Sequence, residues 1–158
     1  MIDVRKIQPN ESVPVEATVE VAMPQGFGAV DTSVAVKGRL IGRRDSFILD
    51  AEASCRLEMT CCRCLRSVKQ QLSFHITENF VETETPIGED IGFSDKAIDI
   101  LPAVQRNLFL SIPMKSLCDE DCAGLCKQCG ANLNDNECKC EGEIVNEQFR
   151  DLLQMFED

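Results

Sequence analysis

One stretch of the sequence organises the rest of the chain: Cys118-Asp-Glu-Asp-Cys122-Ala-Gly-Leu-Cys126-Lys-Gln-Cys129-Gly-Ala-Asn-Leu-Asn-Asp-Asn-Glu-Cys138-Lys-Cys140. It holds six of the ten cysteines. The segment Cys126-Lys-Gln-Cys129-Gly130 has the form of a zinc knuckle, because two thiolates three residues apart can bind one tetrahedral ion and the glycine lets the backbone turn beneath it.

Zinc takes four ligands, so the knuckle needs two more from the same stretch. We expect four of its six cysteines to bind one structural zinc ion, and the spacing leaves open which four: Cys118, Cys122, Cys126, Cys129, Cys138 and Cys140. The alternatives are disulfide bonds or free buried thiols. In a chain without export features, paired cysteines more often bind metal than form disulfides.

A second group of cysteines lies upstream, at Cys55 and in Cys61-Cys62-Arg63-Cys64. Cys61 and Cys64 repeat the Cys-x-x-Cys spacing, and they either share one ion with the later cysteines or belong to a separate metal site. Cys55 and Cys62 are interpreted as ordinary strand residues, since a free cysteine packs as a small hydrophobic side chain.

The composition predicts one ordinary domain with a small appendage. The chain has 158 residues, of which 44% are hydrophobic, and this is sufficient for one core. The first residues lack the pattern of a signal peptide, and no apolar run is long enough to span a membrane. We therefore expect a cytoplasmic protein without membrane contact, in a compartment where thiols stay reduced.

The net charge of −11 is unevenly distributed along the chain. Residues 1–80 contain ten Lys and Arg against ten Asp and Glu, whereas residues 81–158 contain six against seventeen. An acidic half repels a phosphate backbone, so it fits a basic partner protein better than nucleic acid. The alternative is that the acidic residues only increase solubility.

Apolar and polar residues alternate with a period of two in four segments, which predicts strands near residues 13–21, 34–41, 47–61 and 68–77. The acidic residues 82–97, rich in Gly and Pro, are interpreted as a mobile loop.

Helical spacing replaces the alternation near residues 99–111, where Leu101, Val104 and Leu108 form an apolar stripe. Asp99 can cap this helix, and Pro102 falls in its first turn. A second amphipathic helix is predicted near the C-terminus, where it either packs on the body or binds a partner; its apolar residues are Val145, Phe149, Leu152, Leu153 and Phe156.

The predicted fold class is α+β. It combines an antiparallel sheet or partial barrel and a packed helix with a small Cys-rich zinc lobe and a C-terminal helix. The predicted domains are a β-rich domain over residues 1–115, which includes the helix near 99–111, and a zinc-binding lobe with the terminal helix over residues 116–158.

Basic residues gather where two predicted strands meet at the Cys61–Cys64 turn. We expect RNA or a partner to contact them, although solvated charges at the end of a hairpin are the common alternative. These residues are Arg56, Arg63, Arg66 and Lys69.

The sequence does not favour an enzyme. It has no Gly-rich phosphate loop, no nucleophile elbow and no His-Glu-x-x-His helix, and His75 is its single histidine. A zinc closed by four thiolates has no open position for water. A redox role would need a Cys-x-x-Cys at a helix start, whereas Cys61 and Cys64 lie between strands. We therefore expect a binding or assembly protein without a small-molecule substrate.

Three segments of the chain resemble the YceD family, the large ribosomal RNA subunit accumulation proteins. They are Cys61-Cys-Arg-Cys64-Leu65, the segment Ile98–Pro113, and Cys118-x3-Cys122-Ala-Gly-Leu-Cys126-x2-Cys129-Gly-x-Asn-Leu-Asn134. Lys127 replaces a common proline of this family and Cys62 is an additional cysteine, and neither change affects the candidate ligands.

The resemblance implies a non-enzymatic factor needed for normal levels of large-subunit rRNA in bacteria and plastids. We expect it to bind large-subunit pre-rRNA, a basic ribosomal protein or both. The alternative is a thiol-redox or zinc-handling protein. Neither the oligomeric state nor the pairing of thiolates on zinc follows from the sequence.

Overall fold

The computed structural model describes residues 1–23, 32–83, 85–86, 88–135 and 138–140. Its main feature is a five-stranded sheet in the order β2-β3-β4-β5-β6. The strands are β2 (Ser12–Val21), β3 (Thr32–Gly42), β4 (Ser46–Thr60), β5 (Ser67–Glu82) and β6 (Ile91–Phe93). A small antiparallel sheet joins β1 (Ile2–Asp3) to β7 (Ala97–Ile98), and the helix is α1 (Leu101–Ser111). The α+β class is confirmed.

Strands β4 and β5 form the longest pair, in antiparallel register from Ser46 opposite Val81 to Thr60 opposite Ser67. Successive side chains of a strand point to opposite faces, so the alternation read in the sequence becomes one buried and one open face. On the buried face Leu49 and Ile76 are fully enclosed. The four strands predicted from the alternation are all present.

The segment interpreted as a loop, residues 82–97, contains structure that the sequence pattern did not indicate. β6 pairs with the end of β5 in parallel, from Phe80 opposite Ile91 to Glu82 opposite Phe93. Ile91 and Phe93 are both buried. Strands of two or three residues are too short to give a measurable period, and this is why the pattern did not predict them.

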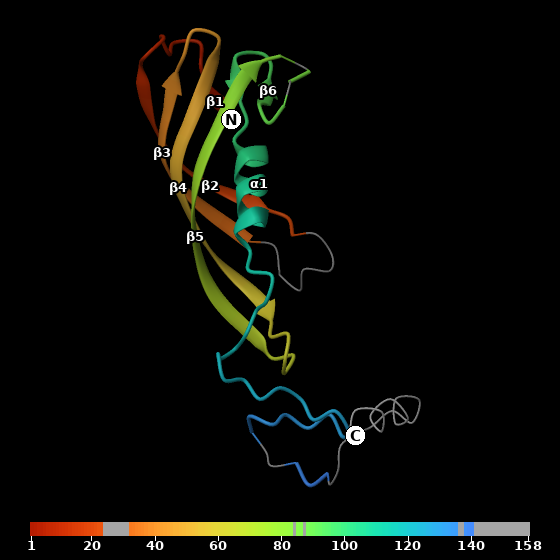
Figure 1. The fold of residues 1–158 in the computed structure, drawn as a ribbon. Coiled ribbons are helices and arrows are strands. Elements are labelled where there is room, and N and C mark those ends of the chain that lie inside the picture. The colour runs from red at the N-terminus through yellow and green to blue at the C-terminus, as the bar shows by residue number, and fades with distance from the viewer. Residues whose placement is uncertain (24–31, 84, 87, 136–137, 141–158) are drawn as a thin grey trace, which may run out of the picture.

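Helix α1 lies against the sheet (Figure 1) and buries Ala103, Val104 and Leu108. The predicted range of 99–111 begins two residues before the observed helix. The carboxylate of Asp99 accepts a hydrogen bond of 2.9 Å from the backbone N–H of Leu101, and a proline occupies the first turn. The helix stops at Ile112, whose backbone is extended.

The β4–β5 hairpin extends beyond the part of the sheet that α1 covers (Figure 1). After α1 the chain continues along this hairpin towards its tip, where the cysteine-rich segment lies. Here a second, small hydrophobic cluster is centred on Cys61, Cys64 and Cys122. The main core, which includes Phe80 and Leu108, lies between the sheet and the helix. The fold thus joins the hairpin tip to residues far along the chain.

Two further predictions concern the C-terminal helix and the absence of a membrane span. The predicted C-terminal amphipathic helix, with residues 145–156, lies outside the described residues. Among the residues that are described, no helix is both long and apolar enough to cross a membrane.

Candidate metal centres

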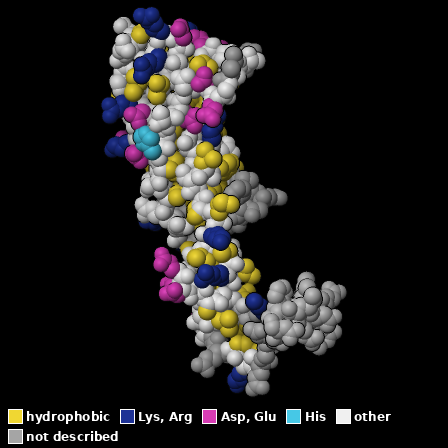
Figure 2. All heavy atoms as spheres, viewed as in Figure 1, with side chains coloured by type: hydrophobic (Ala, Val, Ile, Leu, Met, Phe, Trp, Pro, Cys, Tyr) yellow, Lys and Arg dark blue, Asp and Glu magenta, His cyan; other side chains and the backbone are white. Residues whose placement is uncertain are grey.

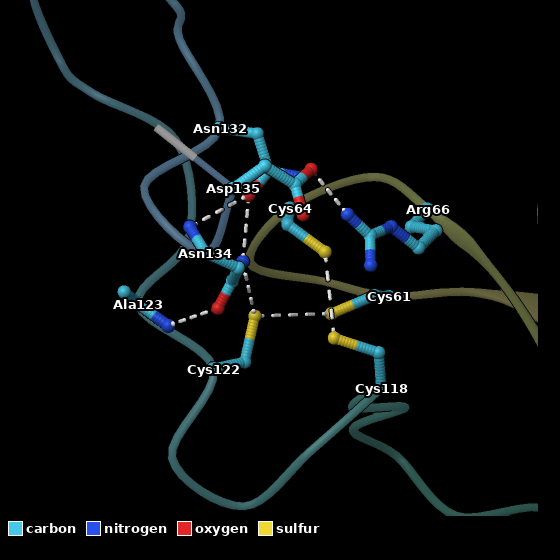
Figure 3. Close-up of polar contacts among 9 residues, drawn as sticks. All are labelled: Cys61, Cys64, Arg66, Cys118, Cys122, Ala123, Asn132, Asn134 and Asp135. Atoms are coloured by element: carbon cyan, nitrogen blue, oxygen red, sulfur yellow. Dashed lines mark hydrogen bonds and ion pairs between the residues drawn. The ribbon is translucent and has the colours of Figure 1, made fainter. Parts of the chain in front are cut away.

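The hairpin tip is a tight turn that presents two thiols. Cys61 ends the alternation of β4 on the buried face, and its N–H donates to the carbonyl of Arg66 (2.8 Å). The N–H of Leu65 donates to the carbonyl of Cys61 (3.0 Å), and Leu65 has a φ of 59°. This backbone turn brings the side chains of Cys61 and Cys64 together (Figure 3).

Four cysteines converge at this tip and form what we call the first cluster: Cys61, Cys64, Cys118 and Cys122. Their sulfur atoms all lie within 4.8 Å of one another. The Sγ atoms of Cys61 and Cys122 are 3.9 Å apart, and those of Cys64 and Cys118 are 3.5 Å apart (Figure 3). Four thiolates around one zinc, at about 2.3 Å each, would be about 3.8 Å from one another.

The remaining four tail cysteines form a second cluster: Cys126, Cys129, Cys138 and Cys140. The Sγ of Cys138 lies 3.2 Å from that of Cys126 and 3.6 Å from that of Cys129. The turn repeats that of the hairpin, because the N–H of Gly130 donates to the carbonyl of Cys126 (2.9 Å) and Gly130 has a φ of 73°. Both clusters have sulfur spacings suited to a tetrahedral metal ion.

The structure thus divides the predicted ligands into two sets of four. Cys118 and Cys122 join the hairpin pair, whereas Cys138 and Cys140 join the knuckle pair. The sequence left open whether Cys61 and Cys64 share a site with later cysteines. In the structure they cluster with Cys118 and Cys122. Cys55, buried in β4, and Cys62, exposed, belong to neither cluster.

The two clusters differ in burial. In the first, Cys61, Cys64 and Cys122 are buried and Cys118 is half-buried. In the second, Cys129 and Cys140 are exposed. A reagent in solution therefore reaches the second cluster more directly than the first.

Hydrogen bonds to the sulfur atoms shift the pKa values of several thiols in both clusters. Backbone N–H groups pointing at sulfur, that of Cys64 for Cys61 and that of Cys129 for Cys126, lower the pKa of Cys61 and of Cys126 to about 6. The hydrogen bond with the side chain of Cys122 raises the pKa of Cys118 to about 12.

In the second cluster, hydrogen bonding to the side chain of Cys138 likewise raises the pKa of Cys140 to about 12. Each cluster without a metal therefore has to retain protons between closely spaced sulfurs. A divalent cation can replace these protons, which is the chemistry expected of a metal-binding thiolate set.

Asn134 is a site residue that sequence reasoning missed. Its side-chain N–H donates to the Sγ of Cys122 (3.4 Å), and its Oδ1 accepts from the backbone N–H of Ala123 (2.8 Å; Figure 3). It thereby orients one sulfur of the first cluster from outside the cluster. The only signal in the sequence was its place in the Asn-Leu-Asn segment after the knuckle, and this does not reveal the role.

Two of the four predicted contact residues make internal contacts with the lobe. The guanidinium of Arg63 donates to the carbonyls of Glu120 (3.1 Å) and Cys122 (2.9 Å), and that of Arg66 pairs with Asp135 (Figure 3). Both side chains thus connect the hairpin to the lobe.

The other two predicted contact residues, Arg56 and Lys69, are exposed on the open face of the hairpin, and their side chains make no ion pair or hydrogen bond within the described ranges. On the same face the ring of His75 lies 2.9 Å from Glu52 and 3.1 Å from Asp50. In Figure 2 basic and acidic side chains are interspersed on the visible face. His75 is therefore not a ligand of either cluster.

These features define an α+β protein in which a long hairpin and a cysteine-rich lobe share a four-cysteine cluster. A family model described as "Large ribosomal RNA subunit accumulation protein YceD" matches residues 49–156. The chain belongs to this YceD family. The matched region begins in β4 and includes all eight clustered cysteines.

Several relatives are similar to this chain at modest identity. The chloroplastic YCED homolog 1 proteins, each named a large ribosomal RNA subunit accumulation protein, are 28% identical over 148 residues in Zea mays and over 153 residues in Arabidopsis thaliana. These alignments cover 72% and 77% of this chain, and 50% and 48% of the relatives.

An uncharacterised protein of Mycobacterium tuberculosis is 33% identical over 101 residues, which is 60% of this chain and 48% of that protein. The chain thus spans about half the length of the curated relatives it matches. No solved structure matches the chain.

Proposed function

We propose that this chain is a non-enzymatic factor that supports accumulation of large-subunit rRNA and acts in the cytoplasm. The family match over residues 49–156 carries the proposal, because it includes the hairpin, helix α1 and both cysteine clusters. The names of the plant relatives refer to the same process. The part of the chain on which this proposal rests is therefore the part that contains both cysteine clusters.

Zinc is the metal that we propose for the cysteine clusters, with a structural role. Four thiolates in a tetrahedral arrangement are a common zinc donor set, and a site closed by four protein ligands leaves no position for a reacting water. This supports a binding protein over an enzyme. Within the described residues, both clusters consist of cysteine alone.

A basic ribosomal protein is the partner that the charges favour. Residues 81–158 carry seventeen acidic against six basic residues, which attracts a basic protein and repels RNA phosphates. Because Arg63 and Arg66 contact the lobe, Arg56 and Lys69 are the two predicted contact residues whose charges such contacts do not engage.

The function can be tested in cells depleted of the protein by measuring the ratio of large- to small-subunit rRNA. We expect the ratio to fall and to recover with the wild-type chain or with Cys62→Ser, but not with Cys61→Ser. Cys62 is the matched control, since it is adjacent in sequence yet belongs to neither cluster. An unchanged ratio with normal ribosome profiles would contradict the proposal.

The choice of partner can be tested by charge reversal. The double variant Arg56→Glu, Lys69→Glu should still capture large-subunit ribosomal proteins. The control is Lys37→Glu, since Lys37 lies on the same open face and pairs with Glu16. A loss of pre-rRNA binding in the double variant, but not in the control, would show that RNA contacts the hairpin directly.

A zinc-handling protein is the second candidate, and one observation favours it: Cys129 and Cys140 of the second cluster are exposed. A protein that donates zinc must release the ion to a competing ligand. Full loss of both ions to a mild chelator, together with unchanged rRNA levels after depletion, would support this candidate over the first.

A further inference from the structure

We propose that the chain binds two zinc ions in two independent sites with different tasks. The ion in the first cluster joins the β4–β5 hairpin permanently to the lobe, whereas the ion in the second cluster holds only the outer part of the lobe and exchanges with solution. This inference rests on the zinc proposed above and not on the ribosomal role.

The two sites are independent because each cluster is complete. Each has four sulfurs that lie within 4.8 Å of one another, so no thiol has to bridge two ions. Cys122 and Cys126 are only four residues apart, yet they belong to different clusters. Between them Gly124 has a φ of 78°, a left-handed conformation that turns the backbone.

The close approach of Gly124 to the hairpin fixes this turn. A Cβ at Gly124 would lie 3.2 Å from the carbonyl oxygen of Arg63, a tighter contact than side chains normally make. The backbone after Cys122 therefore packs directly on the hairpin turn. The positive φ at this position also favours glycine over any other residue.

The first cluster connects parts of the chain that are distant in sequence. Cys61 and Cys64 come from the hairpin, and Cys118 and Cys122 follow α1. Three hydrogen bonds and the Arg66–Asp135 ion pair cross the same junction. Two of the hydrogen bonds come from Arg63, and one of 2.8 Å runs from the N–H of Cys62 to the carbonyl of Ser116. Release of this ion therefore requires the lobe to separate from the hairpin.

The second cluster is local and open. Its four ligands fall within residues 126–140, and it is held by short-range contacts such as the hydrogen bond of 2.8 Å from the N–H of Cys126 to the carbonyl of Ala131. Exposed Cys129 and Cys140 allow a competing ligand to reach the ion without any opening of the core. Exchange is therefore expected at this site.

Native mass spectrometry of the full chain tests the number of ions. We expect two zinc ions in the wild type, one in Cys64→Ser, one in Cys129→Ser and none in the double variant. Cys55→Ser and Cys62→Ser, outside both clusters, should each retain two. A wild type with a single ion, or loss of an ion from either control, would overturn the inference.

Release to a chromogenic chelator tests the division of tasks. We expect two phases of one ion each, with the slow phase roughly 100-fold slower, since three hydrogen bonds must open first. Cys129→Ser should keep only the slow phase and Cys64→Ser only the fast phase. Equal rates, or the reverse assignment, would contradict the inference while leaving the zinc proposal intact; absence of any zinc would instead refute that proposal.

Hydrogen exchange supplies a readout that does not depend on the chelator. The amide of Cys62, which donates to Ser116, should lose protection in Cys64→Ser and keep it in Cys129→Ser. Protection of the β4–β5 amides serves as the control for folding. Retained protection at Cys62 in Cys64→Ser would show that the metal does not join hairpin and lobe.

Discussion

Leu65 and Gly130 occupy the same position in two equivalent turns, each directly after a Cys-x-x-Cys pair. Both donate their N–H to the carbonyl of the first cysteine, and both have a positive φ, of 59° and 73°. An L-residue in this conformation costs about 1 kcal/mol, and glycine avoids that cost. The hairpin turn is therefore the more strained of the two.

Leu65→Gly should raise the free energy of unfolding by about 1 kcal/mol, and Gly130→Ala should lower it by a similar amount, because the two changes relieve and introduce the same strain. Denaturant unfolding of the metal-saturated proteins measures both. The side chain of Leu65 is 65% exposed, so its loss removes little packing. A destabilised Leu65→Gly variant would indicate that this side chain has a role that outweighs the strain.

At the residue level the sequence predicted which cysteines cluster better than what surrounds them. The Cys-x-x-Cys spacing and the glycine after Cys129 are local signals, and all eight candidate cysteines lie in the two clusters. The internal contacts of Arg63 and Arg66 depend on where the lobe folds back, which no local pattern reveals. The sequence therefore did not reveal that these two basic residues contact the lobe.

Helix α1 is defined by one buried face. Leu108 is fully buried against the sheet, whereas Leu110, two residues on, is 79% exposed. Leu108→Ala should lower the free energy of unfolding by about 2–5 kcal/mol, because it leaves a cavity in the main core. Leu110→Ala, the matched control, should change it by less than about 0.5 kcal/mol. Thermal unfolding compares the two, and similar losses would mean that Leu110 is covered in solution.

Among the elements, long periodic segments were predictable and short ones were not. Strands β2 to β5 and the stripe of α1 have enough residues to reveal a period of two or of 3.6. β1, β6 and β7 have two or three residues each; β1 and β7 pair with each other from opposite ends of the domain, and β6 pairs with the end of β5. Their existence depends on tertiary contacts and not on local preference.

For the whole molecule, the separation of the two hydrophobic clusters predicts two levels of stability. The main core lies between sheet and helix and contains no residue of either cysteine cluster. Removal of zinc with a strong chelator should therefore unfold the lobe and leave the sheet intact. Hydrogen exchange should show loss of protection in residues 112–135 and retained protection around Leu49 and Ile76. Collapse of both regions together would mean that the sheet depends on the metal.

The long stretch of chain between the two halves of the first cluster also matters while the protein is being made. Cys64 and Cys118 are separated by 54 positions. At translation rates of about 5–20 residues per second, roughly 3 to 11 s pass between their synthesis. During that interval the nascent hairpin presents Cys61 and Cys64 without the other two cysteines of the cluster. These two thiols are then open to any thiophilic ion or oxidant. The first cluster can therefore form only after residues 118–122 have been synthesised.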